Sequence, residues 1–382
     1  MTAIEVDRDR TARRAREVRL FATFAGGYSR KPLPAQPDLL GDAERRLLEG
    51  DLDADGFRAV ADEFVREILG EMAVVELGIV GEGGVRAHDR IIPWIRGLEG
   101  LAAGDHTTLP DGEPATRPIA QDTVLWTRPV TVRDWQFAAG QTDLPVKQTM
   151  VGPYSLAALA ETDPKGRADL AVQLGEALNL EILALAAAGC PMVEIDEPIT
   201  LQIGEDIAEF RAFRAANERL FAGLESDDGP HLSLGLWGGQ IDPAGYEDLI
   251  ALPYRSYLVD VLAGPSAWRF LDAVPPARGI IVGSADARTE RLDETEVHVW
   301  AMAWAAQEGR GSDRVGCSPN GSLGLIGRHF AHRKCLRLGE AVRIGSMGPL
   351  QEVAEALDEN PAESKLPELR AMARAVESAR GS

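Results

Sequence analysis

Short apolar runs alternate with amphipathic segments along most of the chain. Helical spacing of apolar residues is clearest at 57–68, and a stretch at 169–188 ends at Gly189, a residue favoured just after a helix. Further helices are predicted at 207–224, 266–273 and 294–307, with starts near residues 242 and 325. The apolar runs predict eight strands. One starts at residue 192 and is stopped by Pro198, and the others lie at residues 19–25, 72–80, 146–151, 231–237, 257–262, 279–285 and 314–318.

Eight alternating strand and helix units predict an α/β protein with one closed (β/α)₈ barrel, the TIM barrel. Strands joined by helices form a parallel sheet with right-handed crossovers, and 382 residues lie inside the range for barrels with insertions. An open doubly wound sheet would need a glycine fingerprint in its first turn, which this sequence lacks. We expect a single barrel domain at 19–350, with charged helical extensions at 1–18 and 351–382.

The segment 192–198 carries two adjacent acids directly after an apolar strand. Met192, Val193 and Ile195 are followed by Asp196 and Glu197, and a proline then stops the strand. Acids beside a buried strand are costly unless they are paired, hydrogen-bonded or used. In a barrel, catalytic groups project from the carboxyl ends of the strands. The alternative interpretation is a strand that runs into an acidic surface loop.

The other predicted strands also end in polar or glycine residues. Because the carboxyl ends of barrel strands converge, residues that are distant in sequence meet at one mouth. Acids at four strand ends favour a functional mouth over isolated structural partners. His231 and Ser233 lie deeper, inside the fifth strand. The mouth candidates are Gly26, Gly27, Tyr28, Glu82, Arg86, Gly152, Pro153, Asp196, Glu197, Trp237, Asp260, Asp286, Arg288 and the segment 317–320.

The composition of the chain indicates its cellular compartment and excludes some classes of binding partner. A net charge of −20 argues against nucleic acid, whose phosphates need clustered Lys and Arg. The three cysteines are too few and too scattered for a disulfide framework, which indicates a reducing compartment. The amino terminus has no apolar signal core, and the longest apolar stretch, 182–193, is too short to span a bilayer. We expect a cytoplasmic protein that binds neither nucleic acid nor membrane; a homo-oligomer is left open.

Five motifs, in order along the predicted strands, resemble those of one known family. They are the turn 25–30, Gly81-Glu82 with Arg86, Lys147 with Gly152-Pro153, Ile195-Asp196-Glu197-Pro198, and Asp286-Ala287-Arg288. Together they resemble the catalytic carboxy-terminal barrel of cobalamin-independent methionine synthase, and especially its short single-barrel relatives. The resemblance covers roughly residues 21–342. Its Gly-Glu-x-x-Arg element has one extra residue here.

The resemblance implies a site for a small amino-acid-like substrate. Glu82 and Asp196 would hold an ammonium group, and the turn Gly26-Gly27-Tyr28 would grip the substrate through its backbone. We expect Arg86, Lys147, Glu197, Trp237 and Arg288 to complete the binding site. The expected catalytic groups are His231, Asp260 and Asp286.

The family's chemistry depends on a zinc ion held by His-x-Cys, a glutamate and a second cysteine. Here Ser233 and Gly321 stand at the two cysteine positions, and Asp260 stands near the glutamate position. Thiolates are the donors that give such sites their affinity for zinc. We therefore expect no bound metal. If one binds, its ligands would be His231, Asp260 and Cys317.

The resulting hypothesis is a divergent transferase whose ancestral reaction moves a methyl group from methyltetrahydrofolate to a thiol such as homocysteine. Methyltetrahydrofolate is the cofactor that the resemblance implies. One alternative is a metal-free lyase or hydrolase that uses the mouth acids and His231 as general acid and base. Another is a catalytically silent barrel that binds an amino acid.

Overall fold

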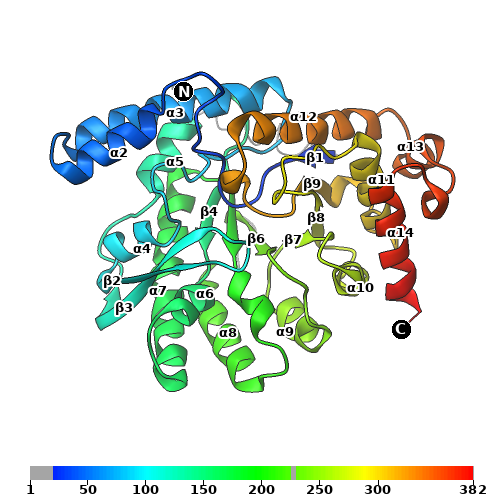
Figure 1. The fold of residues 1–382 in the computed structure, drawn as a ribbon. Helices are drawn as coiled ribbons and strands as arrows, with labels where there is room; N and C mark the ends of the chain where they lie inside the picture. Colours follow the sequence, from blue (N-terminus) through cyan, green and yellow to red (C-terminus); the bar gives the residue numbers. More distant parts are fainter. Residues whose placement is uncertain (1–19, 225–228, 382) are drawn as a thin grey trace, which may run out of the picture.

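The computed structural model describes residues 20–224 and 229–381, and its centre is a curled sheet of seven parallel strands (Figure 1). The strands follow the order β1-β9-β8-β7-β6-β5-β4. Strands β4 to β9 are therefore adjacent in the order in which they occur along the chain, and β1 lies beside β9, as in a barrel. All the pairs are parallel, as helical crossovers require. The strands are β1 (Leu20–Ala22), β4 (Gln148–Val151), β5 (Met192–Asp196), β6 (His231–Leu236), β7 (Ser256–Asp260), β8 (Gly279–Ala285) and β9 (Val315–Pro319).

The strand predicted at 72–80 is the one that the structure does not contain. Residues up to Val74 belong to the helix α3 (Ala54–Val74), because the 3.6-residue apolar period continues through Met72 into the core. Beyond the helix, the amides of Gly78 and Ile79 donate to the carbonyl of Ala22 in β1. On the other side only Val80 forms an isolated parallel bridge, with the residue two before β4. The α/β class is confirmed, whereas a complete eight-stranded barrel is not.

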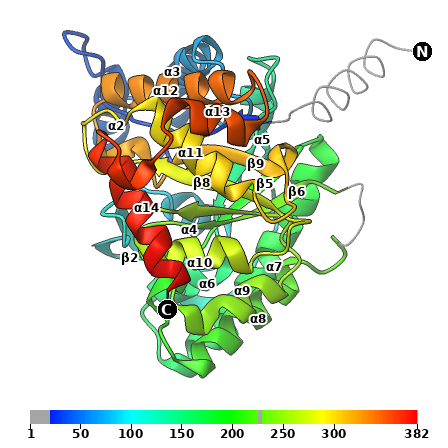
Figure 2. The ribbon, with the colours of Figure 1, turned by 90° about the vertical axis from the view of Figure 1, so that its right-hand side faces the viewer.

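Helices cover the outside of the sheet (Figures 1 and 2). The longest, α7, begins after Asp163, whose carboxylate accepts from the Gly166 amide, and ends at Gly189 in the left-handed conformation, as predicted. By length and composition Lys165–Ala188 could cross a membrane. However, it packs against α6 and α8, and 56% of its most apolar stretch is buried, as in the core helices of globular proteins. The helices are α2 (Leu39–Glu49), α3, α4 (Ile92–Gly97), α5 (Val132–Ala139), α6 (Pro153–Leu159), α7 (Pro164–Ala188), α8 (Ile207–Leu220), α9 (Tyr246–Ala251), α10 (Pro265–Ala273), α11 (Thr295–Ala305), α12 (Arg328–Gly345), α13 (Leu350–Leu357) and α14 (Pro367–Arg380).

An antiparallel hairpin, β2 (Glu99–Thr108) with β3 (Pro114–Leu125), lies outside the barrel sheet and is absent from the sequence prediction. Its turn is closed by hydrogen bonds between Leu109 and Glu113 and from Gly112 to Leu109. Gly112 has φ +91°, a conformation that favours glycine. The hairpin matters for function because its tip carries Asp111 and Glu113 toward the carboxyl ends of the strands.

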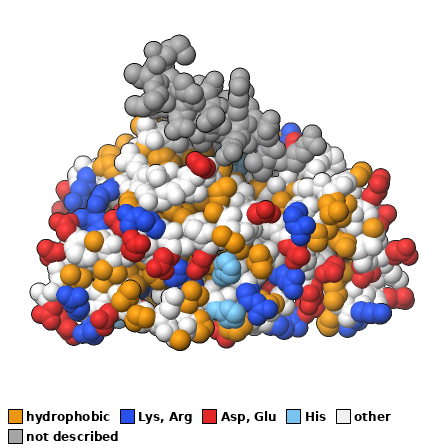
Figure 3. Space-filling view, turned by 90° about the horizontal axis from the view of Figure 1, so that it is seen from above, with side chains coloured by type: hydrophobic (Ala, Val, Ile, Leu, Met, Phe, Trp, Pro, Cys, Tyr) orange, Lys and Arg blue, Asp and Glu red, His pale blue; other side chains and the backbone are white. Residues whose placement is uncertain are grey.

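The carboxy-terminal helical extension expected at 351–382 contains α14, which packs against α10. Arg269 of α10 donates to the carbonyl of Ala379 at 3.1 Å. The charged helix predicted near the amino terminus lies outside the described residues, and the domain boundaries stay a prediction. Acidic and basic side chains are interspersed over the part of the face that remains visible in Figure 3.

Candidate functional site

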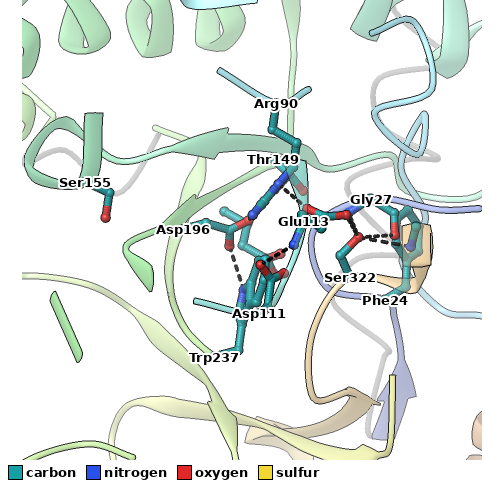
Figure 4. Close-up of polar contacts among 12 residues, drawn as sticks. Phe24, Gly27, Arg90, Asp111, Glu113, Thr149, Ser155, Asp196, Trp237 and Ser322 are labelled. Carbon is teal, nitrogen blue, oxygen red and sulfur yellow. Dashed lines mark hydrogen bonds and ion pairs between the residues drawn. The ribbon is translucent and has the colours of Figure 1, made fainter. Parts of the chain in front are cut away.

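Asp196, the last residue of β5, lies at the centre of the mouth and is fully buried. Its Oδ1 accepts a hydrogen bond from Trp237 Nε1 at 3.1 Å, and its Oδ2 pairs with Arg90 Nη1 at 2.9 Å (Figure 4). The neighbouring strand provides the room for this carboxylate, because a Cβ on Gly235 would collide with Asp196 Oδ1. The carboxylate that sequence reasoning placed at the mouth is therefore tightly held there by both of its oxygens.

Arg90 connects Asp196 to the hairpin tip. Its Nε lies 2.7 Å from Glu113 Oε2 as an ion pair, and its guanidinium carbon lies 4.6 Å from the centre of the Trp237 ring. Figure 4 shows the guanidinium between the two carboxylates. Burial lowers the pKa of Arg90, but Glu113, Asp196 and Asp111 together raise it above its usual value. Arg90 is thus a permanent cation inside the mouth.

Glu113 also joins the hairpin to the first and last strands. Ser322, which follows β9, donates its hydroxyl to Glu113 and accepts a hydrogen bond from the Gly27 amide at 3.2 Å. Gly27 and Ser322 are 295 residues apart in sequence, and Glu113 and Ser322 are 209 residues apart, yet Figure 4 shows the three side by side. The first-strand turn, the hairpin and the turn after β9 therefore form one hydrogen-bonded network with Asp196.

The electrostatic environment of Asp196 is mixed. Burial, followed by repulsion from Glu194, raises its pKa, while Arg90 and Lys147 oppose that rise. Lys147 Nζ lies 2.7 Å from Glu194 Oε2 and 2.6 Å from the Phe24 carbonyl, and both charged side chains are fully buried. Lys147 thus forms an ion pair in the interior, and its positive charge helps to lower the pKa of Asp196.

Glu82 and Arg86 form a second charged group beside the first. Arg86 Nε lies 3.1 Å from Glu82, and Arg86 Nη1 lies 2.6 Å from Asp62 on α3. Burial raises the pKa of Glu82 to about 7, and Asp134 adds to the rise, whereas Arg86 opposes it. A cavity of about 100 Å³ separates this loop from β4 and is lined by both Glu82 and Arg90. The two charged groups therefore share one small cavity.

Glu197 points away from Asp196. Its two carboxylate oxygens accept hydrogen bonds from the amides of Tyr154, at 3.1 Å, and Ser155, at 2.7 Å, at the start of α6. Gly152 has no room for a Cβ beside this carboxylate. Burial raises the pKa of Glu197 to about 7. Ser155 lies apart from the Asp196 cluster in Figure 4, so Glu197 anchors α6 rather than facing the mouth.

The turn after the first strand, residues 26–28, has its two glycines at the mouth and its tyrosine side chain in the core. Gly26 has φ +56°, and a Cβ there would lie 3.0 Å from the Trp237 ring. Gly27 bonds to Ser322, whereas Tyr28 is buried and donates its hydroxyl to Glu71 of α3 at 3.1 Å. The two glycines therefore lie at the mouth, and the Tyr28 side chain does not.

Asp260, Asp286 and Arg288 gather on the β7–β8 side of the mouth. Asp260, the last residue of β7, accepts hydrogen bonds from Asn320 and from the Leu262 amide, each at 3.0 Å. Arg288 lies 3.4 Å from Asp260 and from Asp286. Burial raises the pKa of Asp260 to about 6, whereas the pKa of Asp286 is lowered: burial would raise it, but hydrogen bonds from Arg288 and Thr289 outweigh that effect.

His231 lies at the opposite end of the barrel. It is the first residue of β6, and its Nε2 lies 2.8 Å from Ser256 Oγ at the start of β7. Ser233 in β6 pairs with Ser256 in β7, so Asp260, four residues beyond Ser256, is level with position 237. Position 237 lies six residues beyond His231, which corresponds to about 20 Å at roughly 3.3 Å per residue. A cavity of about 620 Å³ at the amino ends of the strands is lined by His231. Burial, followed by Arg255, lowers its pKa to about 4. The expectation that His231 acts with the mouth acids is corrected.

The residues named as zinc ligands do not assemble either. Cys317 in β9 is fully buried, and its thiol points to the carbonyl of Leu338 in α12, outside the sheet. Asp260 lies at the mouth, and His231 lies at the other end. In residues 20–224 and 229–381 no three His, Cys, Asp or Glu side chains are grouped as a metal site. The donors therefore do not fit the zinc ion that the resemblance implies.

Four residues of the network were not named from the sequence: Arg90, Asp111, Glu113 and Ser322. Asp111-Gly112 is a hairpin-turn dipeptide, so the turn was detectable. What the sequence lacks is any local signal that this turn reaches the mouth, because that depends on the packing of the hairpin against α4 and α7.

The fold and the site together define a class: an α/β barrel-like protein with buried acids and arginines gathered at the carboxyl ends of its parallel strands. A family model described as the catalytic domain of cobalamin-independent synthase matches residues 40–213. The resemblance to the cobalamin-independent methionine synthase family that the motifs predicted is confirmed over this segment.

The curated relatives are 5-methyltetrahydropteroyltriglutamate–homocysteine methyltransferases. One from a Synechococcus strain is 29% identical over 154 residues, which is 39% of this chain and 20% of the relative. Another from Thermotoga petrophila is 26% identical over 197 residues, 50% of this chain and 26% of the relative. The match thus spans only about a fifth to a quarter of these relatives.

Two solved structures share the fold. A B12-independent methionine synthase from Shewanella sp. W3-18-1, in complex with selenomethionine, has a TM-score of 0.67 at 18% identity. A protein from Listeria monocytogenes named as a vitamin-B12-independent methionine synthase has a TM-score of 0.68 at 16% identity. In both comparisons 85% of this chain and 96% of the other chain are covered.

Proposed function

We propose that this chain is a methyltransferase that acts at the carboxyl-end mouth on a small thiol or thioether of amino-acid type, in the cytoplasm. The observation that carries the proposal is the buried Asp196 with its partner Arg90. Both lie inside the segment that matches the catalytic domain of cobalamin-independent synthases. Support for the substrate type comes from the Shewanella relative, which was solved with selenomethionine, the selenoether analogue of the thioether amino acid methionine.

The proposed reaction moves a methyl group from a methylated tetrahydropteroyl donor to a thiol, which is the reaction named for the curated relatives. A sulfur–carbon bond forms, the carbon–nitrogen bond of the donor breaks, and the thiol proton must leave. Glu82 is the group in the mouth cavity suited to accept that proton, because its pKa of about 7 lies near neutral pH. The donor nitrogen takes a proton from solvent.

The lyase or hydrolase alternative is less favoured because His231, one of its acid–base groups, lies about 20 Å from the mouth acids by strand rise. The silent amino-acid binder remains a distinct outcome of the test. It would bind a thioether amino acid at the mouth but transfer no methyl group.

The test supplies methyltetrahydropteroyl triglutamate with homocysteine and a panel of other small thiols, and detects the methylated product by mass spectrometry. We expect transfer to at least one thiol and a loss of at least tenfold in Asp196→Asn, since truncating one member of a buried charge pair costs about 2–5 kcal/mol. His231→Gln is the matched control and should retain activity. No transfer together with calorimetric binding of methionine would support the silent binder instead.

A further inference from the structure

The cation that faces Asp196 comes from the chain itself. Arg90 reaches Asp196 Oδ2 at 2.9 Å and Glu113 at 2.7 Å, and it lies over the Trp237 ring. Trp237 holds the other oxygen of Asp196. Asp196 is fully buried, so no third direction is open to a ligand cation.

The segment that carries Arg90 is firmly anchored. Asp89 is buried, and its Oδ1 accepts a hydrogen bond from the Ile91 amide at 2.6 Å. Ile91 is fully buried, and the helix α4 begins at the next residue. Withdrawing the guanidinium would break two ion pairs and leave Asp196 and Glu113 buried without a counter-charge, which is costly. A ligand ammonium group that arrived while Arg90 stayed in place would meet like-charge repulsion.

The arginines do offer donors to a ligand. Nη2 of Arg90 and Nη2 of Arg86 are buried, and neither has a hydrogen-bond partner in the described part of the chain. Both side chains line the cavity beside β4, together with Glu82, which is already paired with Arg86. Buried donors without partners are costly unless something accepts from them. A carboxylate or carbonyl oxygen would satisfy them, and an ammonium group would not.

We propose that Arg90 takes the place of a substrate ammonium group, so that the mouth selects thiol or thioether carboxylic acids that have no free α-amino group. This inference rests on the proposed methyl transfer at the mouth, and it replaces the amino acid as substrate by the corresponding carboxylic acid without the amino group. Arg90 supplies the positive charge that Asp196 requires, and the ligand carboxylate accepts from the guanidinium groups of Arg90 and Arg86.

The test is calorimetric binding of a matched pair of thioethers to the full chain: methionine and 4-(methylthio)butanoate, which differ only in the α-ammonium group. The wild-type protein should bind 4-(methylthio)butanoate at least as tightly as methionine. Arg90→Met removes the internal cation but keeps a flexible side chain over Trp237, and it should shift the affinity ratio toward methionine by at least tenfold. Arg90→Lys keeps a cation and should retain the wild-type preference.

Arg90→Met leaves two buried carboxylates without a cation and could fail to fold, which thermal unfolding would reveal. The double variant Arg90→Met, Glu113→Gln removes one of those charges and is the second test of the same shift. The inference is overturned if the wild-type protein prefers methionine, or if the ratio in the folded variants that carry Arg90→Met stays within tenfold of the wild-type ratio. Binding of neither thioether to any variant would overturn the proposed function as well, whereas methyl transfer to homocysteine with a preference for methionine would overturn only this inference.

Discussion

Glu197 should make the protein less stable as the pH rises through neutrality. The carboxyl group is completely buried, and its partners are the amides of Tyr154 and Ser155 rather than a cation. Burial raises its pKa from 4.5 to about 7 in the folded chain. A carboxyl group whose folded pKa is raised binds its proton more tightly in the native state. Its stabilising contribution is therefore fully present below about pH 4.5 and is lost as the pH rises through about 7.

The size of the effect follows from that shift. A shift from 4.5 to about 7 corresponds to a total of about 3–4 kcal/mol at about 1.4 kcal/mol per pKa unit. Between pH 5 and pH 8 most of this, about 2–3 kcal/mol, should be lost. Glu197→Gln cannot ionise, so its free energy of unfolding should lack this component of the pH dependence.

The assay is urea unfolding of the wild-type protein and Glu197→Gln at several pH values between 5 and 8. Other raised carboxyl groups, including Asp196 and Glu82, contribute to both curves, so the difference between the two proteins isolates Glu197. Glu247→Gln, at an exposed position on α9, is the matched control and should parallel the wild type. Parallel curves for the wild type and Glu197→Gln would refute the argument that Glu197 is buried without a compensating charge.

Three further outcomes are expected at the mouth. Gly235→Ala should lower the free energy of unfolding by about 1–3 kcal/mol in urea titrations, because the added methyl group would collide with Asp196 Oδ1. Trp237→Phe keeps the ring under Arg90 but removes the hydrogen bond to Asp196, and should cost about 1.5–3 kcal/mol of stability by the same measurement. In calorimetry, His231→Gln should bind the mouth ligand as the wild type does; weakened binding would contradict its placement at the amino ends of the strands.

Most of the sheet was predictable because each strand is a short apolar run bounded by turn residues. The exception at 72–80 shows the limit of that signal. Met72 and Leu77 are both buried, but Met72 lies on the core face of a long helix and Leu77 follows the helix end. A short apolar run cannot distinguish these cases without knowing where the preceding helix stops.

The site was predictable where it follows directly from strand polarity. Asp196 and Asp260 are the last residues of their strands, and the structure places both at the mouth. His231 is the first residue of a six-residue strand, so it belongs to the opposite end of the sheet, a distinction that depends on the strand boundary. Arg90 and Glu113 lie on connections, where local patterns do not indicate which distant carboxylate or cation a side chain will meet.

The hairpin explains how an acidic mouth can be buried at all. Asp111, Glu113 and Asp196 are three acids that surround Arg90. Among the described residues, Arg90 is the only cation that forms an ion pair with Asp196 or with Glu113. The hairpin adds negative charge there, yet it also encloses Arg90 and connects through Ser322 to the first strand. The enclosure strengthens each ion pair by excluding water. The acidic centre, its internal cation and the hairpin tip therefore depend on one another, so a ligand that binds at this mouth has to match the charge of the whole network rather than that of Asp196 alone.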